Sequence, residues 1–135
     1  MICSRTSSAN SVMQNLGKLR VWHLAKDMYV DIALLLPPRA CLRMPGLRSQ
    51  VIRAALSVSA SIAEGSGRGS SQEFRHFVDS SLGSLFEVEN YLDTALAVGI
   101  ISHDSHRALT NRSRVLRRML ISLRKRLDNP RQLTP

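Results

Sequence analysis

The last third of the chain carries the residues best suited to chemistry, and the chemistry that their type and spacing favour is phosphate binding. Residues 104–135 hold nine Arg or Lys against Asp104 and Asp128. Cations spaced along one helix can neutralise consecutive phosphates, which gives salt-dependent binding with little sequence preference. The candidate nucleic-acid-binding residues are Arg107, Arg114, Arg117, Arg118, Arg124, Lys125 and Arg126, accompanied by Arg112 and Arg131. The alternative is a solvated helix face whose charges pair with acids such as Asp79 and Asp93.

Other spacings that resemble catalytic or ligand-binding motifs are incomplete. The glycine-rich stretch 65–69 follows a helical pattern, whereas a phosphate-binding loop follows a strand. Glu73 and His76 form one E-x-x-H pair, and a di-iron bundle needs a second pair and two further carboxylates. His103 and His106 supply only two metal ligands, and no serine-nucleophile motif is present. We therefore expect no enzyme activity, no bound metal and no cofactor.

The elements that position these residues are helical. Hydrophobic residues make up 44% of the chain but aromatic residues only 4%, and apolar side chains recur at steps of three and four residues. The pattern predicts helices over 19–36, 47–64, 71–98 and 103–127, and no strand. Short connections favour an all-α, antiparallel up-down-up-down four-helix bundle over 19–127. Residues 1–18 are expected to be a disordered tail and residues 128–135 a short basic tail.

The stretch 62–74, IAEGSGRGSSQEF, predicts a sharp turn between the second and third helices. Gly65 suits a position with positive φ just past a helix end. Ser70 and Glu73 have the spacing of a capping box, so a new helix is expected to begin there. Pro37 is expected to end the first helix, and Gly99 the third.

Charge and composition limit the partners. The net charge is +9, which favours an acidic partner such as RNA or DNA. Pairing of the acidic third helix with basic segments of the same or a neighbouring subunit would absorb part of this excess. No apolar run of about 18 residues and no signal-peptide pattern is present, so we expect a cytoplasmic protein without membrane contact. Cys3 and Cys41 lack metal-like spacing and are expected to be reduced.

Two motifs resemble a known family. The first is R-A-A-x-S-V-x-x-x-I-A-E-G-x-G-R over 53–68, followed by the S-x-x-E-F turn, and the second is L-G-S-L-x-E-x-E over 82–89. Together with the segment order over 19–127, they resemble the four-helix-bundle proteins encoded within intervening sequences of bacterial 23S ribosomal RNA genes. Two positions depart from the family pattern: Ser59 stands where proline is usual, and Ser61 where asparagine is usual.

The resemblance implies a four-helix bundle, a homo-oligomer that is pentameric, and no known reaction. Related bundles act as nucleic-acid-binding accessories of reverse transcriptases. The residues at matching motif positions are Arg53, Glu64, Gly65, Gly67, Arg68, Glu73, Glu87 and Glu89. We expect their charged members to form a network near the bundle end that fixes subunit geometry, with a functional site as the alternative.

The resulting hypothesis is a non-enzymatic oligomeric bundle with an RNA- or nucleic-acid-associated accessory or scaffold role. The alternative is a structural protein–protein interaction scaffold that does not bind nucleic acid. No small-molecule substrate is indicated. Met13 lies just before the first helical segment, so translation from Met13 is an alternative in which residues 1–12 would be a start-site extension.

Overall fold

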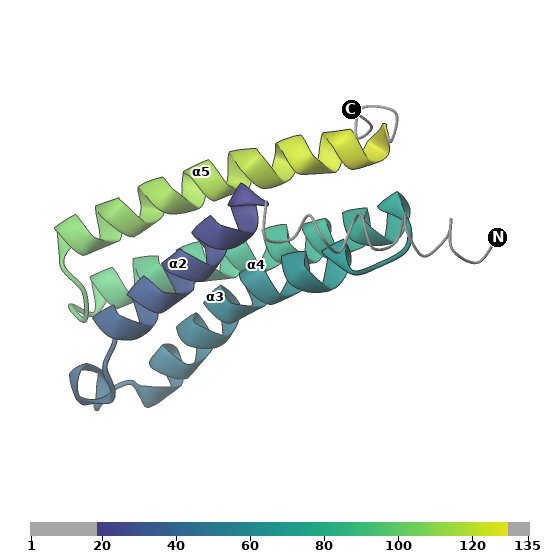
Figure 1. The fold of residues 1–135 in the computed structure, drawn as a ribbon. Helices are drawn as coiled ribbons and strands as arrows, with labels where there is room; N and C mark the ends of the chain where they lie inside the picture. The colour runs from purple at the N-terminus through teal and green to yellow at the C-terminus, as the bar shows by residue number, and fades with distance from the viewer. Residues whose placement is uncertain (1–18, 130–135) are drawn as a thin grey trace.

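The computed structural model describes residues 19–129, which form four α-helices and one short 3-10 helix. In chain order the elements are α2 (Arg20–Leu35), η2 (Pro38–Cys41), α3 (Pro45–Ser66), α4 (Ser71–Ala97) and α5 (His103–Asp128). Successive helices run in opposite directions and pack on one another, and α2 also contacts α5 (Figure 1). The predicted all-α up-down four-helix bundle is confirmed. The tail predicted for 1–18 lies outside the described residues. Of the tail predicted for 128–135, only Asp128, the last residue of α5, and its C-cap Asn129 are described.

Local caps set the helix ends within two residues of their predicted positions. The Ser70 hydroxyl accepts a hydrogen bond from the Glu73 backbone N–H at 3.2 Å, as the capping box predicts. The Ser102 hydroxyl likewise accepts from a backbone N–H in the first turn of α5, at 3.1 Å. Gly99 follows α4 with a φ of +79°, which L side chains rarely adopt. Helix α3, the second of the four predicted helices, begins two residues earlier than predicted because Pro45 occupies its first turn, where no N–H is needed.

Gly65 lies inside α3, so the prediction that it occupies a left-handed position past the helix end is wrong. The helix continues to Ser66, and Gly99 alone has positive φ among residues 19–129. The requirement at position 65 is steric: a Cβ there would lie 2.7 Å from Phe77 Cβ and 2.8 Å from Phe74 Cδ1. Glycine therefore lets α4 approach the backbone of α3 just before the turn.

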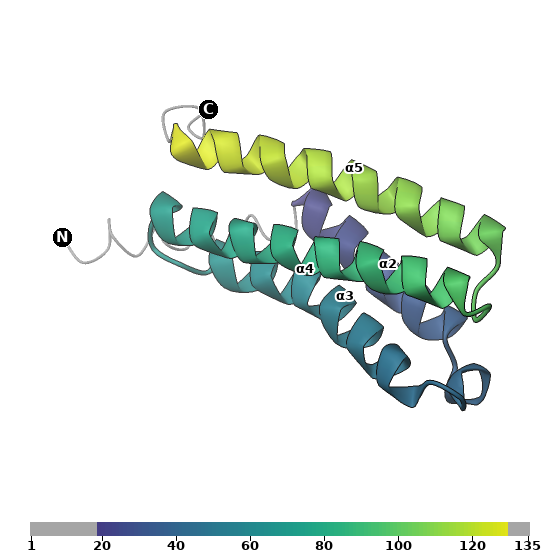
Figure 2. The ribbon, with the colours of Figure 1, turned by 180° about the vertical axis from the view of Figure 1, so that it is seen from behind.

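Small residues continue this close contact along the α3–α4 interface. Ala55 on α3 is fully buried, and the buried Ser81 of α4 donates its hydroxyl to the Val58 carbonyl at 2.8 Å. Further along, the Ser84 and Ser57 hydroxyls are hydrogen-bonded at 2.9 Å. The buried hydroxyls have partners, so their burial carries no unpaired polar group. Figure 2 shows the resulting pair of long, adjacent helices.

Aliphatic side chains from all four helices fill the interior. Leu36, the C-cap of α2, has a fully buried side chain. Its carbonyl accepts a hydrogen bond from Arg48 Nε of α3 at 2.6 Å, and this bond holds the start of α3 against the end of α2. The largest fully buried side chains include Met28, Ile32, Ile62, Leu85, Leu92, Leu116 and Leu120. Over residues 19–129, no helix is both long and apolar enough to span a bilayer.

Replacing Gly65 with alanine is expected to lower the free energy of unfolding by about 1–3 kcal/mol, because the new methyl group overlaps two phenylalanine side chains. Urea denaturation followed by circular dichroism measures the change. Gly83 on α4 provides the matched control, because nothing lies within 4 Å of a Cβ built there. Gly83→Ala is expected to stabilise the bundle by about 0.5–1 kcal/mol. Equal stabilisation by both substitutions would contradict the close helix contact.

Candidate nucleic-acid interface

The basic residues of α5 differ in the direction they face. The buried residues of α5 lie on one side of the helix, and Arg112, Arg117 and Arg124 are half-buried beside them. The other basic residues are exposed: Arg107, Arg114, Arg118, Lys125 and Arg126. The candidate nucleic-acid-binding residues predicted from the sequence therefore form two sets of side chains with different surroundings. Arg131 lies outside the described residues.

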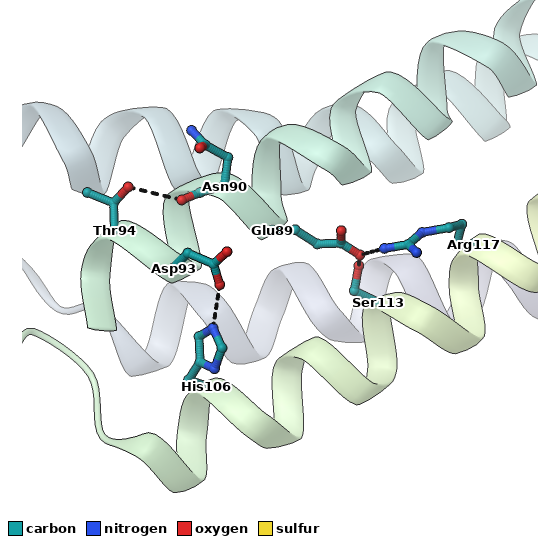
Figure 3. A network of polar contacts seen from close by, with 7 residues as sticks. All are labelled: Glu89, Asn90, Asp93, Thr94, His106, Ser113 and Arg117. Carbon is teal, nitrogen blue, oxygen red and sulfur yellow. Dashed lines mark hydrogen bonds and ion pairs between the residues drawn. The ribbon is translucent and has the colours of Figure 1, made fainter. Parts of the chain in front are cut away.

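Arg117 takes part in a polar network that joins α5 to α4 (Figure 3). The guanidinium donates to Oε1 of Glu89, and Ser113 Oγ donates to the same oxygen at 2.6 Å. Ser113 is fully buried, and the Glu89 side chain is only 19% exposed. The Arg117 guanidinium also lies 5.0 Å from the centre of the Phe86 ring. This directional, partly buried pair fixes the position of α5 along α4.

More exposed ion pairs link α5 to its neighbours on both sides. Arg124 Nη1 lies 3.0 Å from Asp79 of α4, and Arg112 pairs with Asp31 of α2. Near the helix ends, Arg75 forms an ion pair with Asp128 at 2.7 Å, and His106 Nε2 is hydrogen-bonded to Asp93 at 2.6 Å. Exposed pairs of this kind each contribute about 0–1 kcal/mol. Of the arginines and lysines of the fourth helix, acids within residues 19–129 thus contact only the three beside its buried side, Arg112, Arg117 and Arg124, which we call the flanking arginines.

Four cations form a line along the outer side of α5, which we call the outer row: Arg107, Arg114, Arg118 and Lys125. Their spacing of seven, four and seven residues returns to nearly the same side of a helix with 3.6 residues per turn. The row is about 27 Å long at a rise of 1.5 Å per residue. None of the four forms an ion pair with any residue between 19 and 129. Arg126 is also exposed, but it faces the start of α2.

The motif residues do not form the single network expected at the bundle end. Glu64 and Arg68 form an exposed ion pair at 3.0 Å across the end of α3, and Glu89 takes part in the separate network with α5. Gly67 is the C-cap of α3 and donates its N–H to the Glu64 carbonyl at 3.2 Å. The remaining charged members are exposed and form no ion pair within 19–129: Arg53, Glu73 and Glu87.

The residues of the two incomplete metal motifs lie on α4 and α5. Glu73 and His76 are both exposed on α4, and His103 is exposed at the start of α5. His106 contacts Asp93, as Figure 3 shows. Within the described part of the chain, no three His, Cys, Asp or Glu side chains are grouped so that they could hold a metal ion.

The helical part of the chain matches a family model. The family is described as 23S rRNA-intervening sequence protein, and the match covers residues 17–122. The chain belongs to this family. The match extends from just before α2 into α5, so it includes most of the outer row and ends before Arg124. No curated protein matches the sequence.

A solved structure with a similar fold supports the same architecture. It is the crystal structure of a protein with unknown function from the S23 ribosomal protein family of Bacteroides thetaiotaomicron. The two chains share 21% sequence identity with a TM-score of 0.70, and the alignment covers 78% of this chain and 98% of the other. Similarity at this level establishes a shared fold and assigns no activity.

Ser113 contributes to the site but was not singled out from the sequence. It stands at the position between Leu109 and Leu116 where the apolar stripe of the fourth helix requires a core residue. Ser81 stands in the same way between Val78 and Leu85 of α4. A serine inside an apolar stripe was therefore the available signal for a buried hydroxyl with an interhelical partner.

Glu89→Ala is expected to lower the free energy of unfolding by about 1–3 kcal/mol, because it leaves the half-buried Arg117 without its carboxylate. Urea denaturation measures the effect. Glu87→Ala is the control, since Glu87 is two residues away on the same helix, exposed and without an ion pair among the described residues. It is expected to change stability by less than about 0.5 kcal/mol. Equal effects of the two substitutions would show that the network does not hold α5 in place.

Proposed function

We propose that this chain is a non-enzymatic nucleic-acid-binding protein, an accessory or scaffold that holds RNA along α5. The observation that supports the proposal is the outer row, in which four exposed cations lie in line and have no partner within residues 19–129. A nucleic-acid backbone carries negative charges at regular intervals along one direction, and this arrangement matches a line of cations. The family description, which refers to 23S rRNA, is consistent with RNA as the ligand but does not identify it.

The charge distribution on α5 explains why the outer row suits phosphate better than the flanking arginines do. Arg112, Arg117 and Arg124 are already paired with acids of α2 and α4. Binding a phosphate there would break an existing ion pair. The outer row has no such pair to break, and its cations repel one another, so a bound polyanion relieves that repulsion while counterions are released.

Arg107→Glu combined with Arg114→Glu is expected to weaken RNA binding by at least about tenfold at low salt and to flatten the salt dependence, because two phosphate contacts are lost. For the unmodified protein, four phosphate contacts correspond to an affinity loss of about a hundredfold between roughly 50 and 200 mM salt on duplex RNA. Fluorescence anisotropy with labelled RNA, repeated across this salt range, measures both quantities.

The control is Arg39→Glu combined with Arg43→Glu. It changes the net charge equally at exposed residues of the α2–α3 connection that form no ion pair within the described range. This variant is expected to retain most of its RNA affinity. An equal loss of RNA affinity in both variants would show that binding depends on the net charge and not on the position of the outer row. No binding by the unmodified protein at the lowest salt would favour the alternative function, a protein–protein interaction scaffold.

We further propose that the chain forms a homo-oligomer, pentameric as the family resemblance implies, through the outer side of α2. Val30 and Leu34 lie four residues apart on this helix and are 45% and 75% exposed. An apolar side chain with this exposure stabilises the protein more when a second subunit covers it. Such an assembly would carry one outer row on each subunit, so a single RNA could contact several rows at once and bind more tightly than it binds one row.

Val30→Lys combined with Leu34→Lys is expected to convert the oligomer into a monomer, because two charges would be buried at each subunit contact. Size-exclusion chromatography with light scattering measures the mass. Leu56→Lys is the control: Leu56 is 47% exposed but belongs to α3. A monomeric unmodified protein, or an oligomer that survives the double substitution, would refute this assembly surface.

A further inference from the structure

A cleft of about 400 Å³ lies where the start of α2 meets the second half of α5. Figure 1 shows the purple start of α2 beside the yellow-green part of α5. Its lining combines three arginines, Arg20, Arg118 and Arg126, with the side chains of Leu19, Val21 and Met119. Ser122 adds one exposed hydroxyl. A pocket lined in this way fits a ligand that has an anionic group beside an apolar face.

The positive charge of this cleft is not compensated. No acid lines it, and none of its three arginines forms an ion pair with a residue between 19 and 129. The flanking sequence segments 1–18 and 130–135 contain no Asp or Glu at all. The N-cap of α2 is Leu19, whose side chain makes no capping bond, and the first turn contains no acid. The positive end of the helix dipole therefore adds to the three guanidinium charges.

Arg118 belongs both to the outer row and to this cleft, so the two cationic surfaces are continuous. A strand that follows the outer row reaches the cleft through this residue. The volume is suited to a single nucleotide-sized group. A base can enter only if it is not paired and stacked, because the bases of a duplex are held inside the helix and only its backbone and groove edges are accessible.

We propose that the cleft binds one unpaired nucleotide of a single-stranded RNA, with its phosphate among the three arginines and its base against the apolar wall. The inference rests on the proposed nucleic-acid function and specifies its ligand: a single strand in preference to a duplex. The outer row supplies affinity that both forms share, and the cleft supplies the discrimination between them.

The test compares binding of a labelled single-stranded RNA with binding of a duplex of the same length. Arg20→Ala combined with Arg126→Ala removes two cleft cations and leaves the outer row intact. We expect it to raise the Kd for the single strand by about tenfold or more, since two charge-assisted contacts are lost, and the Kd for the duplex by less than about threefold. Ser122→Asp, which puts a negative charge on an exposed cleft residue, is expected to have the same selective effect.

Arg39→Ala combined with Arg43→Ala removes the same charge elsewhere and is expected to affect neither RNA form selectively. Circular dichroism of each variant checks that the fold is retained. Equal weakening of single-strand and duplex binding, or no change in either, would overturn the cleft proposal while leaving the outer-row function intact. An unmodified protein that binds neither RNA would instead refute the proposed function, and the cleft proposal with it.

Discussion

The contact between α3 and α4 at Gly65 is the constraint on which the rest of the bundle depends. Because no side chain separates the two helices there, the Phe74 ring and the Cβ of Phe77 lie directly against the α3 backbone. The Ser81 and Ser84 hydrogen bonds extend the contact along both helices. These bonds are directional, so they fix the register as well as the distance. The orientation of α4 that results decides which of its acids face α5.

The orientation of α4 also decides which arginines of α5 form ion pairs and which do not. Glu89 and Asp79 lie on the α5 side of α4, so the arginines that flank the core of α5 meet them. Asp31 does the same from α2. Glu87 faces away and pairs with no residue in the described range. The arginines beside the core of α5 are thus paired with acids of the bundle. The cations on the opposite side of α5 have no acidic partner within residues 19–129.

The fold could be predicted from the sequence because its signals are local. Apolar periodicity located each helix, and prolines, serine caps and Gly99 set the ends within two residues. The error at Gly65 has a tertiary origin: glycine is required equally at a left-handed turn and under an aromatic ring, and the sequence cannot distinguish them. The two serines inside apolar stripes were a readable signal, but their acceptors, the Val58 carbonyl and Glu89, depend on helix orientation.

The candidate interface was predictable to a smaller extent, for a related reason. The spacing of Arg107, Arg114, Arg118 and Lys125 places them on one side of a helix from the sequence alone. Whether a given arginine pairs internally depends on the acid of another helix that it meets, as the contrast between Arg117 and its sequence neighbour Arg118 shows.

The cleft depends on tertiary structure still more strongly, because it exists only where α2 begins part-way along α5. Arg20 and Arg126 are more than a hundred residues apart in sequence and line the same hollow. Uncompensated charge at such a place opposes folding through like-charge repulsion. The anionic partner that we propose for this end of α5 would offset that repulsion.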